Sequence, residues 1–185
     1  MLPHMSIPDG ADLTECGYSL IIETPEPEAP PGQKVIPGPP QNVDGVWSST
    51  WIVRPYDLAE LAVEQNKMWE LIQVKREEVQ KGGYKVGDHW FHSDPDSRTQ
   101  YIALTLLGPN LPSGIEWKTM SGEKVPLTPD LVTGIFQGAV GHDFMVFQVG
   151  EGLRAAMMQL ADPASFDPNA GWPLTYKEST NGNEV

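Results

Sequence analysis

The sequence is poor in positive charge. It holds 12 lysine and arginine residues against 25 aspartate and glutamate residues, a formal net charge of -13 at pH 7. An acidic surface repels phosphate groups, and no cluster of basic residues reverses this locally. The composition therefore argues against nucleic acid and anionic membranes as partners, and solubility is the simplest explanation of the surplus of carboxylates.

Cysteine and long apolar runs are also scarce. Cys16 is the one cysteine, so no disulfide can form within the chain, which suits assembly in a reducing cytoplasm. We interpret Cys16 as a small buried or half-buried residue rather than a redox thiol. The first twelve residues lack the basic start and apolar stretch of a secretory signal, and no apolar run approaches the roughly 20 residues that span a bilayer. We therefore expect a protein that folds in solution and does not insert into membranes.

Apolar residues make up only 39% of the chain, while 18 prolines and 18 glycines exceed the usual share of a globular domain. Seven of the prolines fall between residues 25 and 40. Because proline lacks an amide hydrogen and fixes φ, this stretch is predicted to run as extended, polyproline-like chain. We define residues 25–41 as the proline-rich arm, and we expect it to clasp a neighbouring subunit at a low ordering cost.

Two predicted strands flank this arm. Residues 18–24 (YSLIIET) and 46–53 (VWSSTWIV) show the alternation of half-buried strands, and the turn signal Asp44-Gly45 precedes the second. Trp47 and Trp51 fall on one side of the second strand, and tryptophan is favoured in interfaces because it buries a large area with few rotamers. We therefore predict a small β attachment module over residues 1–56, with the two strands paired and both tryptophans as interface candidates.

The remainder is predicted to be helical, so the expected fold class is α+β. The pattern favours a helical module over residues 57–176 with two short β-hairpins and a long C-terminal helix, followed by a mobile tail over residues 177–185. The almost wholly apolar block Tyr101–Leu107 predicts burial on more than one side of its helix. Phe166 and Trp172 are expected to fold back as apolar anchors. The expected elements are helices at about 58–80, 94–107 and 129–161, and hairpins at 84–92 and 115–127.

The longest predicted helix carries a seam of mainly apolar residues on two adjoining lines, each with seven-residue spacing. It also contains five glycines, and each costs roughly 1 kcal/mol relative to alanine in a helix interior. Such a helix must kink or be held by close packing, and we favour packing. The packing partner is either helix 58–80 or the same helix of another subunit; the latter predicts a homo-oligomer, with a trimer as one of its forms. The interface candidates on this seam are Val132, Ile135, Ala139, His142, Val146, Val149, Leu153 and Leu160.

The histidines are the residues most suggestive of chemistry. His89 and His92 are followed by Asp94 and Asp96, but positions three apart on a strand point to opposite faces, so the two imidazoles should diverge. We therefore favour a hairpin over a metal site. His142 is interpreted as a polar core position that fixes helix register. No nucleophile elbow, phosphate loop or paired-cysteine motif appears, and we expect neither an enzyme nor a bound cofactor.

A series of short stretches from about Trp69 onward carries a resemblance to a known family. These stretches are residues 82–86 (GGYKV), 89–94 (HWFHSD), Ser97-Arg98 with Gln100, 107–112 (LGPNLP), 115–120 (IEWKTM), Thr128-Pro129, Asp162-Pro163 and 171–173 (GWP). In this order they resemble an uncharacterised C-terminal domain of tailed-phage tail-fibre and tail-fibre-assembly proteins. Residues 44–47 and 51–55 look like the opening of tail-fibre assembly proteins, from which the proline-rich arm departs.

The resemblance implies a structural component of a bacteriophage tail, associated with the tail tip, baseplate or tail fibre. Such a protein acts by protein–protein assembly with other tail proteins and is located in the virion after synthesis in the cytoplasm of the bacterial host. One alternative is a tail-fibre assembly chaperone that the virion does not retain. A third interpretation is a metal-dependent hydrolase around His89 and His92. The family has no established catalytic role, so the resemblance implies no active-site residue.

Overall fold

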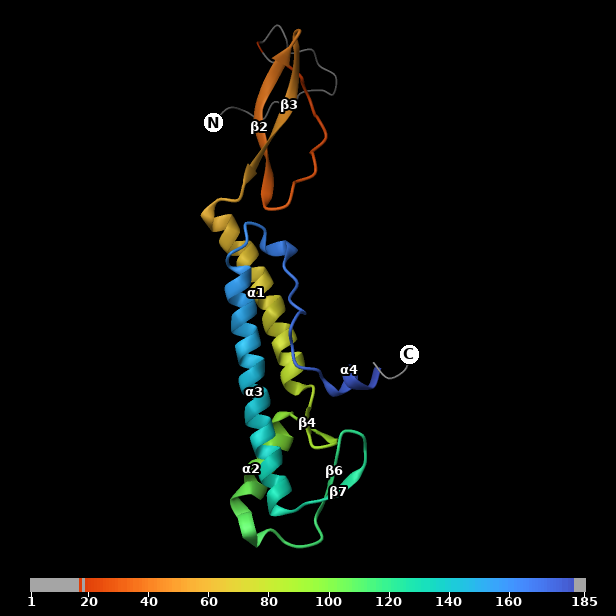
Figure 1. Ribbon diagram of the computed structural model, residues 1–185. Helices are drawn as coiled ribbons and strands as arrows, with labels where there is room; N and C mark the ends of the chain where they lie inside the picture. The colour runs from red at the N-terminus through yellow and green to blue at the C-terminus, as the bar shows by residue number, and fades with distance from the viewer. Residues whose placement is uncertain (1–16, 18, 182–185) are drawn as a thin grey trace, which may run out of the picture. The chain divides into compact units, whose positions relative to one another are not determined.

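A computed structural model describes residue 17 and residues 19–181 (Figure 1). The fold class is α+β, as predicted, with small sheets of short strands, an N-terminal β region and a long C-terminal helix. The chain divides into two units, Met1–Asp57 and Leu58–Val185. The predictions for the first twelve residues, for Cys16 and for the last four residues of the tail lie outside the described residues.

The N-terminal unit contains a three-stranded sheet in the order β1-β3-β2. Strand β3 (Val46–Pro55) lies in the centre, parallel to β1 (Ile21–Ile22) and antiparallel to β2 (Gln33–Val43). The predicted strand at 46–53 and its pairing with the first strand are confirmed, although the first strand is much shorter than residues 18–24. Asp44 and Gly45 have φ of 53° and 85° and form the predicted turn between β2 and β3.

The proline-rich arm is in part a β-strand, which corrects the prediction of polyproline-like chain for residues 33–41. Strand β2 contains Pro37, Pro39 and Pro40, and it lies at the edge of the sheet with β3 as its one neighbour. An edge strand tolerates proline because only one of its sides has to donate hydrogen bonds. The register shifts between Gly38 and Gln41, so Pro39 and Pro40 form a bulge opposite Ser49. The prolines gave no indication of strand β2, which forms because β3 lies beside it.

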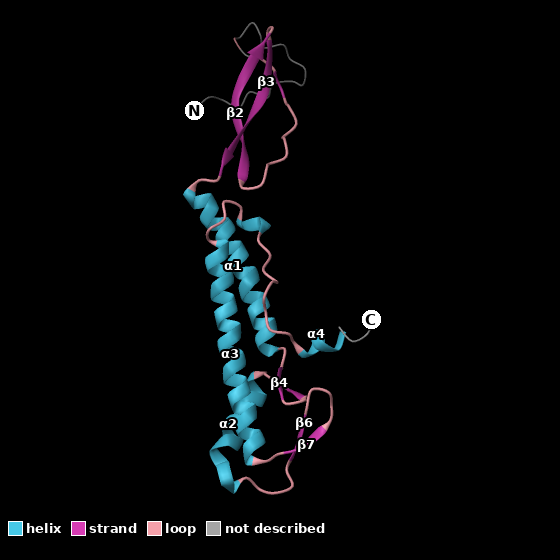
Figure 2. Cartoon of the chain, in the orientation of Figure 1, coloured by secondary structure: helices cyan, strands magenta, loops and turns pink. Residues whose placement is uncertain are grey.

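The second unit is built around helices α1 (Leu58–Lys81) and α3 (Pro129–Met157), which lie side by side, with α2 (Pro95–Leu107) packed against α3 (Figures 1 and 2). Both predicted hairpins are present. The first consists of β4 (Tyr84–Val86) and β5 (His89–Phe91), and the second of β6 (Glu116–Lys118) and β7 (Lys124–Pro126). Short helices η2 (Gly108–Asn110), η3 (Pro163–Ser165) and α4 (Tyr176–Asn181) complete the unit.

Local sequence signals set the helix boundaries. Asp94 caps α2 by accepting a hydrogen bond from the Ser97 amide, and Thr128 caps α3 by accepting one from the Leu131 amide. Proline follows each cap in the first helical turn, where its missing amide hydrogen costs nothing. Helix α3 ends at Met157, four residues before the predicted end, so Leu160 lies beyond the helix.

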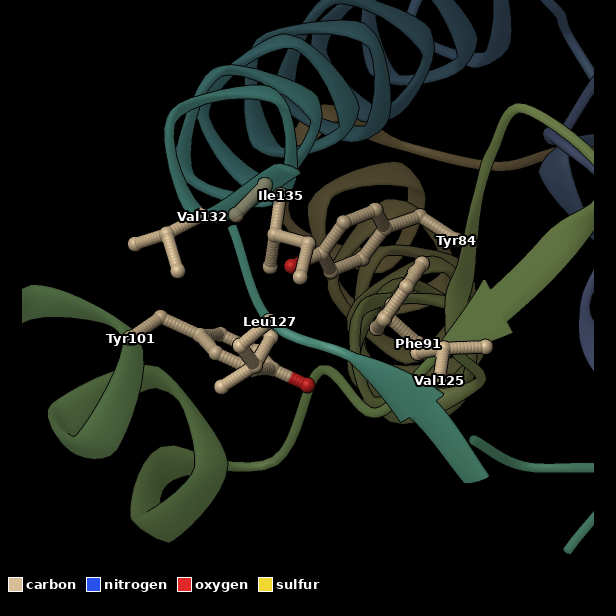
Figure 3. Close-up of a cluster of buried hydrophobic side chains, with 8 residues drawn as sticks. Tyr84, Phe91, Tyr101, Val125, Leu127, Val132 and Ile135 are labelled. Carbon is tan, nitrogen blue, oxygen red and sulfur yellow. The ribbon is translucent and has the colours of Figure 1, made fainter. Parts of the chain in front are cut away.

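Two clusters of buried side chains form the core of the second unit. The larger one joins both hairpins to α2 and α3, and its side chains point toward one another in Figure 3. The smaller one, around Ile72 and Met157, joins α1 to the end of α3, and Phe166 and Trp172 pack against it as the predicted anchors. The larger cluster consists of Tyr84, Phe91, Tyr101, Val125, Leu127, Val132, Ile135 and Ala139.

The seam of α3 is part of this core, which corrects the prediction that it forms an interface between subunits. Val132, Ile135, Ala139, His142 and Val146 are buried within the single chain, and Val149 and Leu153 are half-buried. Helix α1, helix α2 and the first hairpin cover them. Of the two partners considered for the seam, the structure therefore shows the intrachain one.

The five glycines of α3 differ in their surroundings, and the helix runs past all of them without interruption (Figure 2). A Cβ on Gly134 would lie 3.5 Å from Val86 Cγ1, which is an ordinary contact. A Cβ on Gly138 would lie 2.8 Å from Val86 Cγ2, and one on Gly150 would lie 3.3 Å from Arg76 Cδ. At these two positions the predicted close packing is confirmed, against the first hairpin and α1. A Cβ on Gly141 or Gly152 would meet no heavy atom within 4 Å. Intrachain packing does not explain these two.

The chain after η3 returns along the unit and ends in α4. Lys75 Nζ lies 3.4 Å from Glu178 Oε1, and the Tyr176 amide donates to the carbonyl of Gly82. The hydrogen bonds that Glu178 accepts from Thr175 lower the pKa of its carboxyl group. Residues 177–181 are therefore helical, and Glu178 is tied to α1, while the mobility of the tail stays a prediction.

Candidate interaction surface on α2 and α3

Helix α3 carries a second apolar stripe in addition to its buried seam. Phe136, Val140, Phe144 and Phe147 are spaced by four, four and three residues and share one face, roughly a third of a turn from the seam. Their exposed fractions are 36%, 55%, 60% and 56%. A stripe of this spacing normally faces a core, so its exposure marks this side of α3 as unusual.

Helix α2 extends this stripe. The block Tyr101–Leu107 was expected to be buried on several sides, but only Tyr101 is buried, and Leu106 is 83% exposed. The prediction was wrong because α2 packs against the rest of the unit through one face, which leaves Ile102, Leu106 and Leu107 exposed. A cavity of about 180 Å³ between the helices is lined in part by Ile102, Phe136 and Val140. We define the α2–α3 apolar surface as Ile102, Leu106, Phe136, Val140, Phe144 and Phe147.

This surface lies in a region almost without charge. Residues 131–150 of a chain with a net charge of -13 contain no lysine, arginine or glutamate, and Asp143 is their one aspartate. Asp143 forms a bidentate ion pair with Arg98 of α2. In this pair Arg98 Nη2 lies 2.6 Å from Asp143 Oδ1, and Arg98 Nη1 contacts Asp143 Oδ2. This hydrogen bonding raises the pKa of Arg98. Solvated helix faces usually carry charged residues, so a face that is both apolar and neutral is typical of a contact site.

Several hydrogen bonds hold α2 in place against α3. Arg98 Nε donates to the carbonyl of Ser93 at 2.6 Å, and the hydroxyl of buried Ser93 accepts from the Gly83 amide at 2.8 Å. The hydrogen bond from the Ser97 amide lowers the pKa of the capping carboxyl of Asp94. The end of α1, the start of α2 and the middle of α3 are thus linked. The two helices that carry the apolar surface are held as one piece.

His142 is the most deeply buried ionisable group of the seam. It is 4% exposed, and within the described part of the chain neither ring nitrogen has a hydrogen-bond partner. Burial lowers the pKa of His142, which keeps the imidazole neutral. Its ring lies 5.9 Å from that of Tyr84, whose hydroxyl is also buried. His142 therefore lies in the core, as interpreted from the sequence, and its role in fixing register stays a prediction.

His89 and His92, the residues of the metal-site interpretation, lie in different surroundings. His89 Nδ1 lies 3.4 Å from Glu123 Oε2 of the second hairpin. His92 lies just after β5, at the rim of a cavity shared with Ser97 and Trp117. Over residue 17 and residues 19–181, no group of three or more histidine, cysteine or acidic side chains is arranged to hold a metal ion.

The N-terminal sheet presents a second apolar surface. Trp47 is exposed, and Trp51 is half-buried with its indole nitrogen 3.1 Å from the carbonyl oxygen of Thr24. In residue 17 and residues 19–57, no side chain reaches the burial of a core residue. Small sheets are marginally stable in water unless one face is packed. Trp47 and Trp51 therefore remain interface candidates, together with the exposed Ile21, Ile22, Val43, Val46, Ile52 and Val53.

The α2–α3 apolar surface was not predicted from the sequence, because the seven-residue spacing of the seam indicated a different face of α3. Two signals point to it. Phe136, Val140, Phe144 and Phe147 follow one another at helical spacing off the seam, and charged residues are almost missing from 131–150. A helix that is apolar on two separate faces has to bury both of them.

The fold and this surface together define an α+β domain whose distinguishing feature is a neutral apolar face on two helices. Residues 63–170 match the model of a family described as a domain of unknown function, DUF4376. Because the match covers more than half of the chain, the protein belongs to this family. The matched region includes α2 and α3, and the N-terminal sheet lies outside it. No curated protein and no solved structure gives a significant match. Within the described residues, no helix has the length and apolar character needed to cross a membrane.

Proposed function

We propose that this protein is a structural component of a bacteriophage tail, associated with the tail tip, baseplate or tail fibre, and that it acts by protein–protein assembly. The observation that carries the assembly role is the α2–α3 apolar surface, with its three exposed phenylalanines on a neutral face. Contiguous exposed apolar patches of this kind mark interaction sites. The tail assignment rests on the resemblance of the stretches between residues 82 and 173 to tail-fibre and tail-fibre-assembly proteins.

The size of the surface supports a contact of moderate strength. With exposed fractions of 36%, 60% and 56%, Phe136, Phe144 and Phe147 together offer on the order of 300 Å² of apolar area. At about 25 cal/mol per Å², covering this area contributes roughly 7 kcal/mol before the costs of association. A micromolar complex has a net binding free energy of about 8 kcal/mol. The phenylalanines therefore supply a large part of a contact that needs further residues to become tight.

The N-terminal sheet supplies a second attachment surface in this proposal. Its exposed residues lie on both faces of the sheet, because Trp47 and Val53 alternate with Val46 and Ile52 along β3. Prolines in β2 remove hydrogen-bond donors from that edge, which discourages strand addition there. Attachment should therefore use the faces of this sheet rather than the edge formed by β2.

Mass spectrometry of purified particles from a phage that encodes this chain tests the proposal. A structural component is found there in stoichiometric amounts relative to other tail proteins. If the chain is abundant in infected cells but missing from the particles, the tail-fibre assembly chaperone becomes the better assignment. A chain found in neither fraction with tail proteins would rule out both.

A matched pair of variants connects the surface to assembly. The double change Phe144→Ser with Phe147→Ser removes two phenylalanines from the α2–α3 apolar surface. The control, Leu71→Ser with Val74→Ser, removes two comparably exposed residues from α1. Incorporation into particles should fall for the first variant and stay at the level of the unmodified chain for the control.

A further inference from the structure

We propose that the outer face of α3 packs against the same face of a second copy of this chain. The outer face comprises Phe136, Val140, Phe144 and Phe147. This inference rests on the proposed assembly role and names the partner at that site. It replaces the buried seam, which was the first candidate for self-association, with a different side of the same helix.

Charge favours a second copy at this place. Two copies with a net charge of -13 repel each other wherever their charged surfaces meet. The exposed side of α1 carries Glu70 as well as Glu77 and Glu78, which are paired with Lys81 and Lys75. The outer face of α3 presents fewer charges to a second copy, because Asp143 beside it is paired with Arg98, and Glu151 at its end lies within 4.0 Å of Arg76 and Arg154. A basic partner, by contrast, would gain more from the acidic surfaces than from this neutral one.

The two open glycines lie to one side of this face. Gly141 and Gly152 are 11 residues apart, which is about three helical turns, so they lie close to one line along α3, roughly a third of a turn from the phenylalanine stripe. Gly141 lines a cavity together with Tyr84, Trp90 and Leu174. The inference therefore rests on the apolar side chains of the outer face and on its lack of charge.

The size of the face sets the expected strength. Residues 131–150 span about 30 Å of helix, and a helix is about 10–12 Å wide with its side chains. This footprint, even with Ile102 and Leu106 at its side, is smaller than the roughly 800 Å² per partner of a standard interface. We therefore expect self-association in the micromolar range rather than an obligate oligomer.

Sedimentation equilibrium of the full chain tests this inference at concentrations from about 1 to 200 µM, a range that covers micromolar dissociation constants. We expect the unmodified chain to self-associate, and Phe144→Ser with Phe147→Ser to raise the dissociation constant at least about tenfold. The control, Leu71→Ser with Val74→Ser, should associate like the unmodified chain. Added salt should strengthen association, because it screens the repulsion between acidic copies.

A third variant protects the test against misfolding of the phenylalanine variant. Val140→Gln replaces an exposed apolar side chain of the outer face with a polar one of higher helix propensity, so helicity measured by circular dichroism should not fall. It should still weaken self-association. An unmodified chain that is monomeric over the whole range would overturn the inference. So would a phenylalanine variant that associates normally, or a control variant that alone loses association. Particle mass spectrometry is independent of these results, so failure of self-association leaves the proposed tail role to its own test.

Discussion

Alanine at two neighbouring glycines of α3 should change stability in opposite directions. Gly→Ala in a helix interior stabilises by up to about 1 kcal/mol. At Gly141 nothing opposes this gain, since a Cβ there meets no heavy atom within 4 Å. At Gly138 the new Cβ would lie 2.8 Å from Val86 Cγ2 and 3.1 Å from the Tyr84 ring. Overpacking a core typically costs about 1–3 kcal/mol, which exceeds the gain in helix propensity.

We therefore expect Gly141→Ala to raise the free energy of unfolding by about 0.5–1 kcal/mol and Gly138→Ala to lower it by about 1–2 kcal/mol. Urea unfolding followed by far-ultraviolet circular dichroism measures both. The measurement belongs in the Phe144→Ser, Phe147→Ser background, where self-association does not contribute. Equal stabilities for the two alanine variants would refute the packing of the first hairpin against α3.

Three further predictions concern the ionisable groups. Combining Arg98→Met with Asp143→Ala in a double-mutant cycle should give a coupling energy of about 1–2 kcal/mol in urea unfolding, and a value near zero would show that the pair does not hold α2 to α3. Because burial lowers the pKa of His142 below that of the unfolded chain, stability should fall as the pH drops below about 6.5. His142→Leu should reduce this loss and raise the free energy of unfolding at pH 8 by about 1–2 kcal/mol. Urea unfolding at pH 8 and below pH 6.5 measures both effects, and an unchanged pH dependence would contradict the prediction. His89→Ala and His92→Ala should leave the metal content of the purified protein unchanged and alter stability by less than about 0.5 kcal/mol, and loss of a bound metal would revive the hydrolase interpretation.

Local signals were sufficient for most secondary structure of the second unit. The proline and capping residues at the start of α2 and α3 predicted where those helices begin, and Gly87 and Gly122 adopt the positive φ values expected of hairpin turns. These signals act over a few residues and depend little on the rest of the fold. These signals can therefore be recognised in a single sequence without knowledge of tertiary contacts.

Features that depend on a partner element could not be predicted in the same way. Strand β2 contains Pro37, Pro39 and Pro40, and it is a strand only because β3 lies beside it. Seven-residue spacing showed that one face of α3 is covered, but it did not show that α1 and the first hairpin cover it. The composition of residues 101–107 likewise gave no information on how little of α2 is packed against the rest of the unit.

The candidate surface was the hardest feature to predict, because exposure depends on the complete fold. Phe144 and Phe147 have the same hydrophobicity as core residues, and only the structure shows that the chain leaves them uncovered. The neutral character of residues 131–150 was readable from the sequence. It becomes informative once the exposed face of α3 is known.

Disulfide cross-linking at Val140 tests the central claim most directly. Val140 lies near the middle of the exposed stripe, so it should approach its counterpart in a second copy whether the helices pair parallel or antiparallel. In a Cys16→Ser background, Val140→Cys keeps all three phenylalanines and should give covalent dimers on mild oxidation, and Val74→Cys on exposed α1 should not. A chain that stays monomeric with cysteine at 140, or that cross-links equally from both positions, would contradict assembly through the outer face of α3.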